Sequence, residues 1–275
     1  RDTHRDLSDL LKSEGALVIS GAGNETAKAM IVSHMLHFHP QPTLVVAEDE
    51  AQVDILAHWL RFFDQDALPF IDIHHAETEG IRPESLQTFF LFLRGQAGTV
   101  LCPRAVWEAQ FPLFSEAKKR ALMLKVGKEH PFTGFIEDLL NRGYEHAPDK
   151  ELHPGQYRKV GDTLEIFPIQ EREAYQIQFH FDAVESIASL TGQHQKELEL
   201  LPVTCEKTAP LSKQFPKDAL LVIDDLDDLV LGQLVEHDRV VDAVQELRAE
   251  VLLELVVDLC LHPLVVGLRV ILSRE

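Results

Sequence analysis

The chain has 275 residues, of which 45% are hydrophobic and 26% charged, a globular composition that excludes a disordered or membrane-like polypeptide. It carries 26 lysines and arginines against 45 aspartates and glutamates, and the resulting charge of −19 disfavours binding of nucleic acid over the whole surface. The three cysteines lie far apart, which excludes a disulfide framework or a CxxC zinc site and predicts a cytoplasmic protein. The length predicts about two domains. Because the first residue is not methionine, we expect the chain to be a fragment.

The first stretch of the chain alternates short apolar runs with helical patterns. We expect strands at residues 16–20, 43–47 and 98–102, and helices at 25–37 and 49–63. Continuous apolar strands that alternate with helices are typical of a parallel sheet covered on both faces.

The middle of the chain has a different pattern. A helix is expected at 131–142, followed by strands at 162–167 and 175–181 in which polar and apolar residues alternate. These features predict a small α+β unit with an antiparallel sheet.

The last stretch returns to the first pattern. We expect an apolar strand at 219–223, a helix at 240–261 and a strand at 264–272. The apolar residues from 251 to 272 are interrupted by charged ones, so this segment is not expected to cross a membrane.

The simplest organisation is therefore an insertion of one domain into another. Residues 1–126 and 200–275 are predicted to form an α/β domain, and residues 127–199 to form a small α+β domain inserted in it.

The turn after the first expected strand has the place of a phosphate-binding P-loop but not its residues. A P-loop has the pattern GxxxxGK[ST] between a strand and a helix. Counted from Gly21, with Gly23 inside the turn, the lysine position is Ala27 and the hydroxyl position is Lys28. That lysine normally neutralises phosphate, and the hydroxyl holds Mg²⁺. We therefore predict a strand-to-helix turn in a degenerate site that binds no nucleotide.

A second acidic motif follows the strand expected at 219–223. Asp224 and Asp225 give it the shape of a Walker B motif, whose aspartate holds Mg²⁺ in P-loop enzymes. Strands also often end at acidic turns, so a solvated loop is the alternative. Without the P-loop lysine, we expect no magnesium–nucleotide site, and we predict neither a cofactor nor a metal.

The most informative stretch lies in the predicted insert. Residues 153–168 read HPGQYRKVGDTLEIFP and residues 177–187 read IQFHFDAVESI. These segments closely resemble the inserted domain shared by two protein families, the excinuclease protein UvrB and the transcription–repair coupling factor (Mfd). The family pattern is HxGxaRxRGDxxEIFP, with a aromatic, followed by IxFFxDEIE. The resemblance implies a degenerate P-loop NTPase-like α/β domain that carries a small α+β insert.

Two differences from UvrB favour the coupling factor. UvrB proteins keep an intact P-loop and a long hairpin that wedges into DNA, whereas only a short connector is expected here between Pro69 and Phe89. The chain thus resembles the nucleotide-free N-terminal module of the coupling factor, whose insert docks the excinuclease protein UvrA where RNA polymerase has stalled. RNA polymerase and DNA would be contacted only by later parts of such a protein.

The resemblance implies a non-catalytic protein-interaction module. The alternatives are an ATP-binding or a DNA-binding fragment of a UvrB-like repair helicase.

The resemblance also indicates which residues would contact the partner. In the family, exposed arginines beside the RGD turn contribute to the UvrA contact; Arg158 matches the first, and Val160 replaces the second. Arginine suits this role because its fork binds carboxylates bidentately, although a solvated surface charge remains the alternative for Arg158. Lys159 partly replaces the lost charge, but it points to the opposite face of the strand. Tyr157 and Glu165, in the same motif, complete the predicted partner-binding set.

Overall fold

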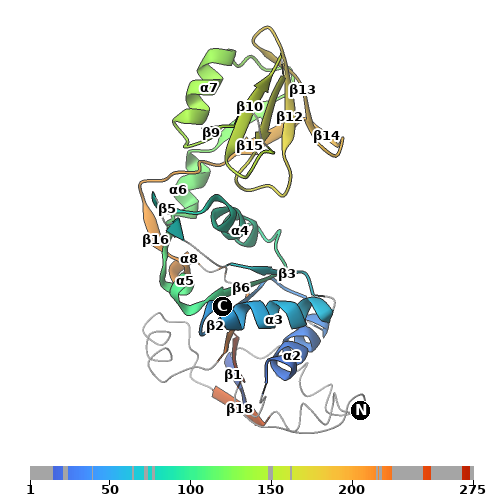
Figure 1. Ribbon diagram of the computed structural model, residues 1–275, viewed down its shortest axis with the longest axis vertical. Coiled ribbons are helices and arrows are strands. Elements are labelled where there is room, and N and C mark those ends of the chain that lie inside the picture. Colours follow the sequence, from blue (N-terminus) through green and yellow to red (C-terminus); the bar gives the residue numbers. More distant parts are fainter. Residues whose placement is uncertain are drawn as a thin grey trace. The chain divides into compact units, whose positions relative to one another are not determined.

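The computed structural model of the chain consists of two compact units, each described by itself (Figure 1). The first unit contains Arg1–Ile71, Gly95–Glu108 and Phe215–Glu275, and the second contains Asp72–Arg94 and Ala109–Gln214. The residues that the structure describes are 15–20, 24–38, 40–63, 65–70, 74–75, 78–147, 151–161, 163–214, 216, 219–224, 244–248 and 268–272.

The first unit is built on a seven-stranded sheet with the strand order β18-β1-β19-β17-β2-β6-β3. Strands β2, β6 and β17 are buried along their whole length, as expected for a sheet that is covered on both faces. The strands predicted for this unit before residue 224 are confirmed. The seven strands are β1 (Gly15–Ser20), β2 (Thr43–Ala47), β3 (Ala67–Pro69), β6 (Thr99–Pro103), β17 (Leu220–Asp224), β18 (Val244–Arg248) and β19 (Leu268–Leu272).

Three helices belong to the described part of this unit: α2 (Glu25–Phe38), α3 (Glu50–Phe62) and α5 (Arg104–Glu108). Asp49 caps the start of helix α3: its carboxylate accepts a hydrogen bond from the Gln52 N–H at 2.9 Å and so satisfies a free donor of the first turn. Apolar side chains from α2 and α3 form one buried core with β2, β6 and β17.

The end of the chain departs from the predicted pattern in two ways. The prediction of a helix at 240–261 is wrong for Val244–Arg248, which forms β18 and pairs in parallel with β1. Apolar periodicity alone does not separate a buried helix from a strand, and the pairing with β1 decides the conformation here. In the described part of the sheet, β19 alone runs antiparallel to its neighbours, β1 and β17. The sheet is therefore mixed rather than wholly parallel.

The second unit is built on a six-stranded sheet with the order β14-β13-β12-β11-β10-β9. Its neighbours pair antiparallel except for β9 and β10, which confirms the predicted α+β character. Helix α7 (Phe132–Leu140) packs on one face of this sheet and lies beside it in Figure 1. The strands are β9 (Glu145–His146), β10 (Gln156–Val160), β11 (Thr163–Phe167), β12 (Tyr175–His180), β13 (Ala183–Ser189) and β14 (His194–Gln195).

Shorter elements complete the second unit. The segment expected as a connector between Pro69 and Phe89 contains a short antiparallel pair, β4 with β5, and most of helix α4. The shorter elements are β4 (His74–His75), β5 (Thr78–Ile81), α4 (Pro83–Leu93), β7 (Gln110–Pro112), α6 (Phe114–Lys119), β8 (Leu122–Lys125), β15 (Glu197–Leu200), β16 (Thr208–Pro210) and α8 (Leu211–Gln214).

No helix among the described residues is long and apolar enough to cross a membrane.

Candidate functional site

The six-stranded sheet has one apolar face and one polar face because side chains alternate along each strand. Tyr157, Leu164 and Ile177 point into the core with α7. Their chain neighbours Arg158 and Glu165 lie directly opposite each other on the other face. This polar face therefore holds two of the residues that the sequence predicts to bind a partner.

Arg158 and Glu165 form a close ion pair on this polar face. The Glu165 Oε2 atom lies 2.6 Å from Nη2 and 2.7 Å from Nε of Arg158. The side chains are 30% and 13% exposed, so the pair is partly shielded from solvent. Glu165 therefore holds the guanidinium against the sheet, and an incoming carboxylate must compete with Glu165 for it.

The other predicted partner-binding residues lie in different environments. Tyr157 is only 4% exposed and belongs to the core, where burial raises the pKa of its hydroxyl. Lys159 is exposed, and its Nζ atom lies 4.5 Å from the centre of the Phe132 ring, a cation–π contact at the start of α7. Val160 ends β10 and is 50% exposed. Arg158, Lys159 and Val160 are thus the members of the set that reach the surface at this end of β10.

A residue that the sequence reasoning missed lies at the same end of the sheet. The β10–β11 turn follows Val160, and the β12–β13 turn contains Phe181 and Asp182. Phe181 is 87% exposed and has a φ of 54°. An aromatic residue at a hairpin turn, where glycine or asparagine is usual, is the sequence signal that identifies it.

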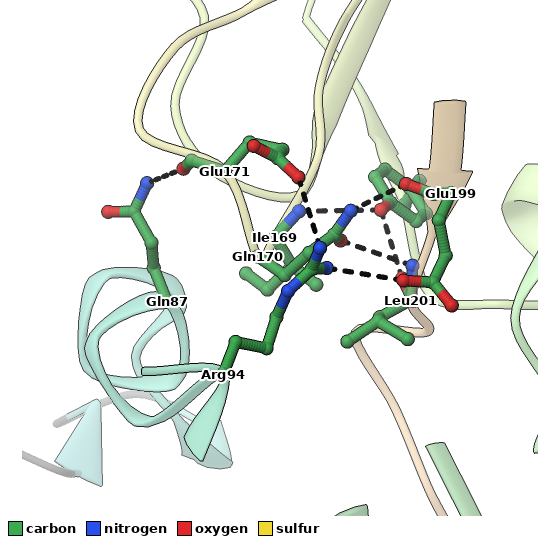
Figure 2. Close-up of polar contacts among 8 residues, drawn as sticks. Gln87, Arg94, Ile169, Gln170, Glu171, Glu199 and Leu201 are labelled. Carbon is green, nitrogen blue, oxygen red and sulfur yellow. Dashed lines mark hydrogen bonds and ion pairs between the residues drawn. The ribbon is translucent and has the colours of Figure 1, made fainter. Parts of the chain in front are cut away.

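Figure 2 shows a polar junction elsewhere in this unit, where α4 ends. Arg94 reaches two carboxylates, Glu199 at 3.2 Å and Glu171 at 3.8 Å. Gln170, which is fully buried, donates to the Glu199 carbonyl and accepts from the Leu201 N–H at 3.1 Å. Burial raises the pKa of the Glu171 carboxyl, and Arg94 opposes that shift. The junction ties α4 to the segments that flank the six-stranded sheet.

In the first unit, two predicted motifs come together although they are 196 residues apart in the chain. The Nζ atom of Lys28 lies 2.8 Å from Oδ1 and 2.9 Å from Oδ2 of Asp224. The Lys28 side chain is 10% exposed, and that of Asp224 is fully buried. Both oxygens of the carboxylate expected to hold Mg²⁺ in a Walker B motif therefore face an ammonium group from the same chain.

One N–H group in the first turn of α2 is also satisfied internally. The Asn24 side chain accepts a hydrogen bond from the Ala27 N–H at 2.8 Å. In nucleotide-binding folds, the free N–H groups of this first turn are the ones that bind phosphate. Gly21, Gly23 and Asp225, the other residues of the predicted degenerate site, lie outside the described residues. No three His, Cys, Asp or Glu side chains gather as candidate metal ligands in the described part of the chain.

Comparison with known proteins places the family match in the second unit. Residues 122–205 match the family described as the UvrB interaction domain. The chain is similar to UvrABC system protein B of Thermus thermophilus, with 26% identity over 207 residues that cover 65% of this chain and 31% of that protein. The protein of the same name from Synechocystis is 28% identical over 198 residues, which cover 64% of this chain and 29% of that protein.

The residues of the family match contain the polar face and both hairpin turns described above. The chain therefore carries a UvrB-like module, and it spans about a third of the length of these relatives, 31% and 29%.

Proposed function

We propose that this chain is a non-catalytic docking module of a transcription-coupled DNA repair factor, and that it recruits UvrA to sites of nucleotide excision repair. The match of residues 122–205 to the UvrB interaction domain carries the proposal. The polar sheet face presents Arg158 beside two exposed turns, a surface suited to a protein partner. RNA polymerase and DNA would be bound by other parts of the parent protein.

The arrangement in the first unit supports a role without nucleotide. A P-loop enzyme needs a lysine for phosphate and a carboxylate for Mg²⁺. Here Lys28 and Asp224 neutralise each other in a buried pair, and Ala27 stands at the lysine position. Binding of Mg-ATP would require that pair to separate, and each of the two buried charges would then need a new partner.

Two further features favour the coupling factor over UvrB. The segment in which UvrB-like proteins carry their DNA hairpin contains only β4, of two residues, and β5, of four residues, among its described strands. The net charge of −19 also disfavours a DNA-binding role for this chain as a whole.

Calorimetry with purified UvrA tests the main proposal. A folded sample should bind, and Arg158→Ala should weaken the binding by about 2 kcal/mol if Arg158 anchors the partner. Lys213→Ala, an exposed lysine on α8, is the matched control for loss of a surface charge and should leave the affinity unchanged. A folded sample without affinity for UvrA would refute the proposal.

The alternative functions have equally direct tests. A nucleotide-binding fragment must gain apparent stability from Mg-ATP, because a ligand that binds the folded state raises its unfolding temperature. A DNA-binding fragment must bind duplex DNA at low salt and lose affinity steeply as salt increases. We expect neither effect.

A further inference from the structure

The β12–β13 turn places a large apolar side chain where the fold itself gains little from it. Phe181 is 87% exposed, so its ring buries almost no surface within the chain. Its φ of 54° lies in the left-handed region, which is unfavourable for a residue with a Cβ atom. Its ring lies against that of the neighbouring His180, at 4.6 Å between centroids. The unfavourable backbone conformation of Phe181 is therefore not offset by burial of its ring within the chain.

The surroundings of Phe181 are firmly held, so the turn presents the ring from a defined place. The Asp182 carbonyl accepts a hydrogen bond from the His130 N–H at 2.6 Å, and its carboxylate accepts one from the Phe132 N–H at 3.3 Å. Val184 exchanges backbone hydrogen bonds with the segment before α7, at 2.8 and 3.0 Å. A rigid support lowers the entropy that a binding residue loses when it docks.

The ring lies at the same end of the sheet as the predicted partner-binding residues. The β10–β11 turn, after Val160, and the β12–β13 turn are at one end because β10, β11 and β12 alternate in direction. Val160 is 50% exposed, and Lys159 adds a positive charge above Phe132. This end of the sheet therefore exposes an aromatic ring, an aliphatic side chain and a cation, and exposed aromatic residues are enriched among interface anchors.

From these observations we infer that Phe181 is the aromatic anchor of the docking surface and inserts into an apolar pocket of the protein partner. The inference rests on the proposed function and names UvrA as the occupant. It adds a contact at the end of the sheet to the one proposed for Arg158, whose guanidinium is held in place by Glu165 at 2.6 Å.

Phe181→Gly separates a role in binding from a role in folding. Glycine adopts positive φ without steric cost, so the variant should unfold at the same temperature as the wild type or at a higher one. Loss of the ring should nevertheless weaken UvrA binding about 30-fold or more, as for an interface hot spot. Phe181→Tyr keeps the aromatic ring and should bind within about threefold of the wild type.

Leu190→Ser provides the matched control, because Leu190 is 57% exposed and follows β13 at the other end of the same sheet. It should leave the affinity for UvrA unchanged. If the wild-type chain binds UvrA and Phe181→Gly binds equally well, the inference about Phe181 is wrong while the proposed function stands. A lower unfolding temperature for Phe181→Gly would also overturn it, since the ring would then serve the fold. Absence of wild-type binding would instead refute the proposed function.

Discussion

Replacing Lys28 with methionine should destabilise the first unit strongly, because the change removes the ammonium group that faces a buried carboxylate. Methionine retains most of the length and the apolar stem of lysine, so the substitution removes the charge with little change of packing. Asp224 is fully buried as a side chain and would face this loss without solvent to compensate it.

The geometry sets the size of the effect. At the observed 2.8 Å between Nζ and Oδ1, opposite unit charges attract by about 6 kcal/mol at an effective dielectric constant of about 20. Desolvation of both groups offsets part of this attraction, and removal of one partner from a buried pair typically costs about 3–5 kcal/mol. We therefore expect a loss of about 3 kcal/mol or more in the free energy of unfolding.

Urea unfolding followed by tryptophan fluorescence measures this loss of stability in the first unit. The chain has two tryptophans, and both Trp59 and Trp107 belong to the first unit. Asp54→Asn, which removes an exposed charge on α3 in the same unit, is the control and should have little effect.

The double variant Lys28→Met with Asp224→Leu completes the test. When both charges are replaced by apolar groups, no buried charge is left unpaired, and much of the lost stability should return. A single variant that loses less than about 1 kcal/mol, or a double variant as unstable as Lys28→Met alone, would refute the reasoning from the ion pair.

Two further predictions concern the second unit. Arg94→Met should lower its stability by about 1.5–3 kcal/mol near pH 7, as measured by urea unfolding, because a hydrogen-bonded charge is lost. Arg94 opposes the raised pKa of Glu171, so the folded variant should hold the Glu171 proton more tightly, and the loss should shrink as the pH falls and this carboxyl is protonated. Gly143→Ala should cost more stability than Gly161→Ala: φ is positive at both, 82° and 63°, but only at Gly143 would the new Cβ meet the Thr204 side chain, at 2.7 Å. Equal losses for the two alanine variants would contradict the steric argument.

The sequence predicted the parts of the fold that depend on local pattern. The apolar run at Thr43–Ala47 and the alternating residues of Tyr175–His180 form strands as expected, because the order of apolar and polar residues along the chain matches their burial patterns. Val244–Arg248 was predicted as helix and forms a strand, since the decisive interaction is its pairing with β1, far away in the sequence. The same limit applies to the antiparallel direction of β19.

The candidate site shows a similar division. The motif around Arg158 was recognisable from the order of its residues, but its pairing with Glu165 depends on the register of β10 and β11. Lys28 and Asp224 were each identified within a degenerate motif, yet nothing in their local sequence indicates that they contact each other. Phe181 was missed because it was predicted to end the strand at 175–181, whereas β12 ends at His180 and Phe181 lies in the turn with a positive φ.

The way in which the two units share the chain limits how either can be exchanged by recombination. Strand β6 belongs to the first unit but is encoded between the two segments of the second, Asp72–Arg94 and Ala109–Gln214. A single exchange that replaced residues 72–214 would also replace β6, the strand between β2 and β3 in the sheet. A new partner specificity is therefore more accessible through point substitutions on the turns of the second unit than through replacement of that unit as one gene segment.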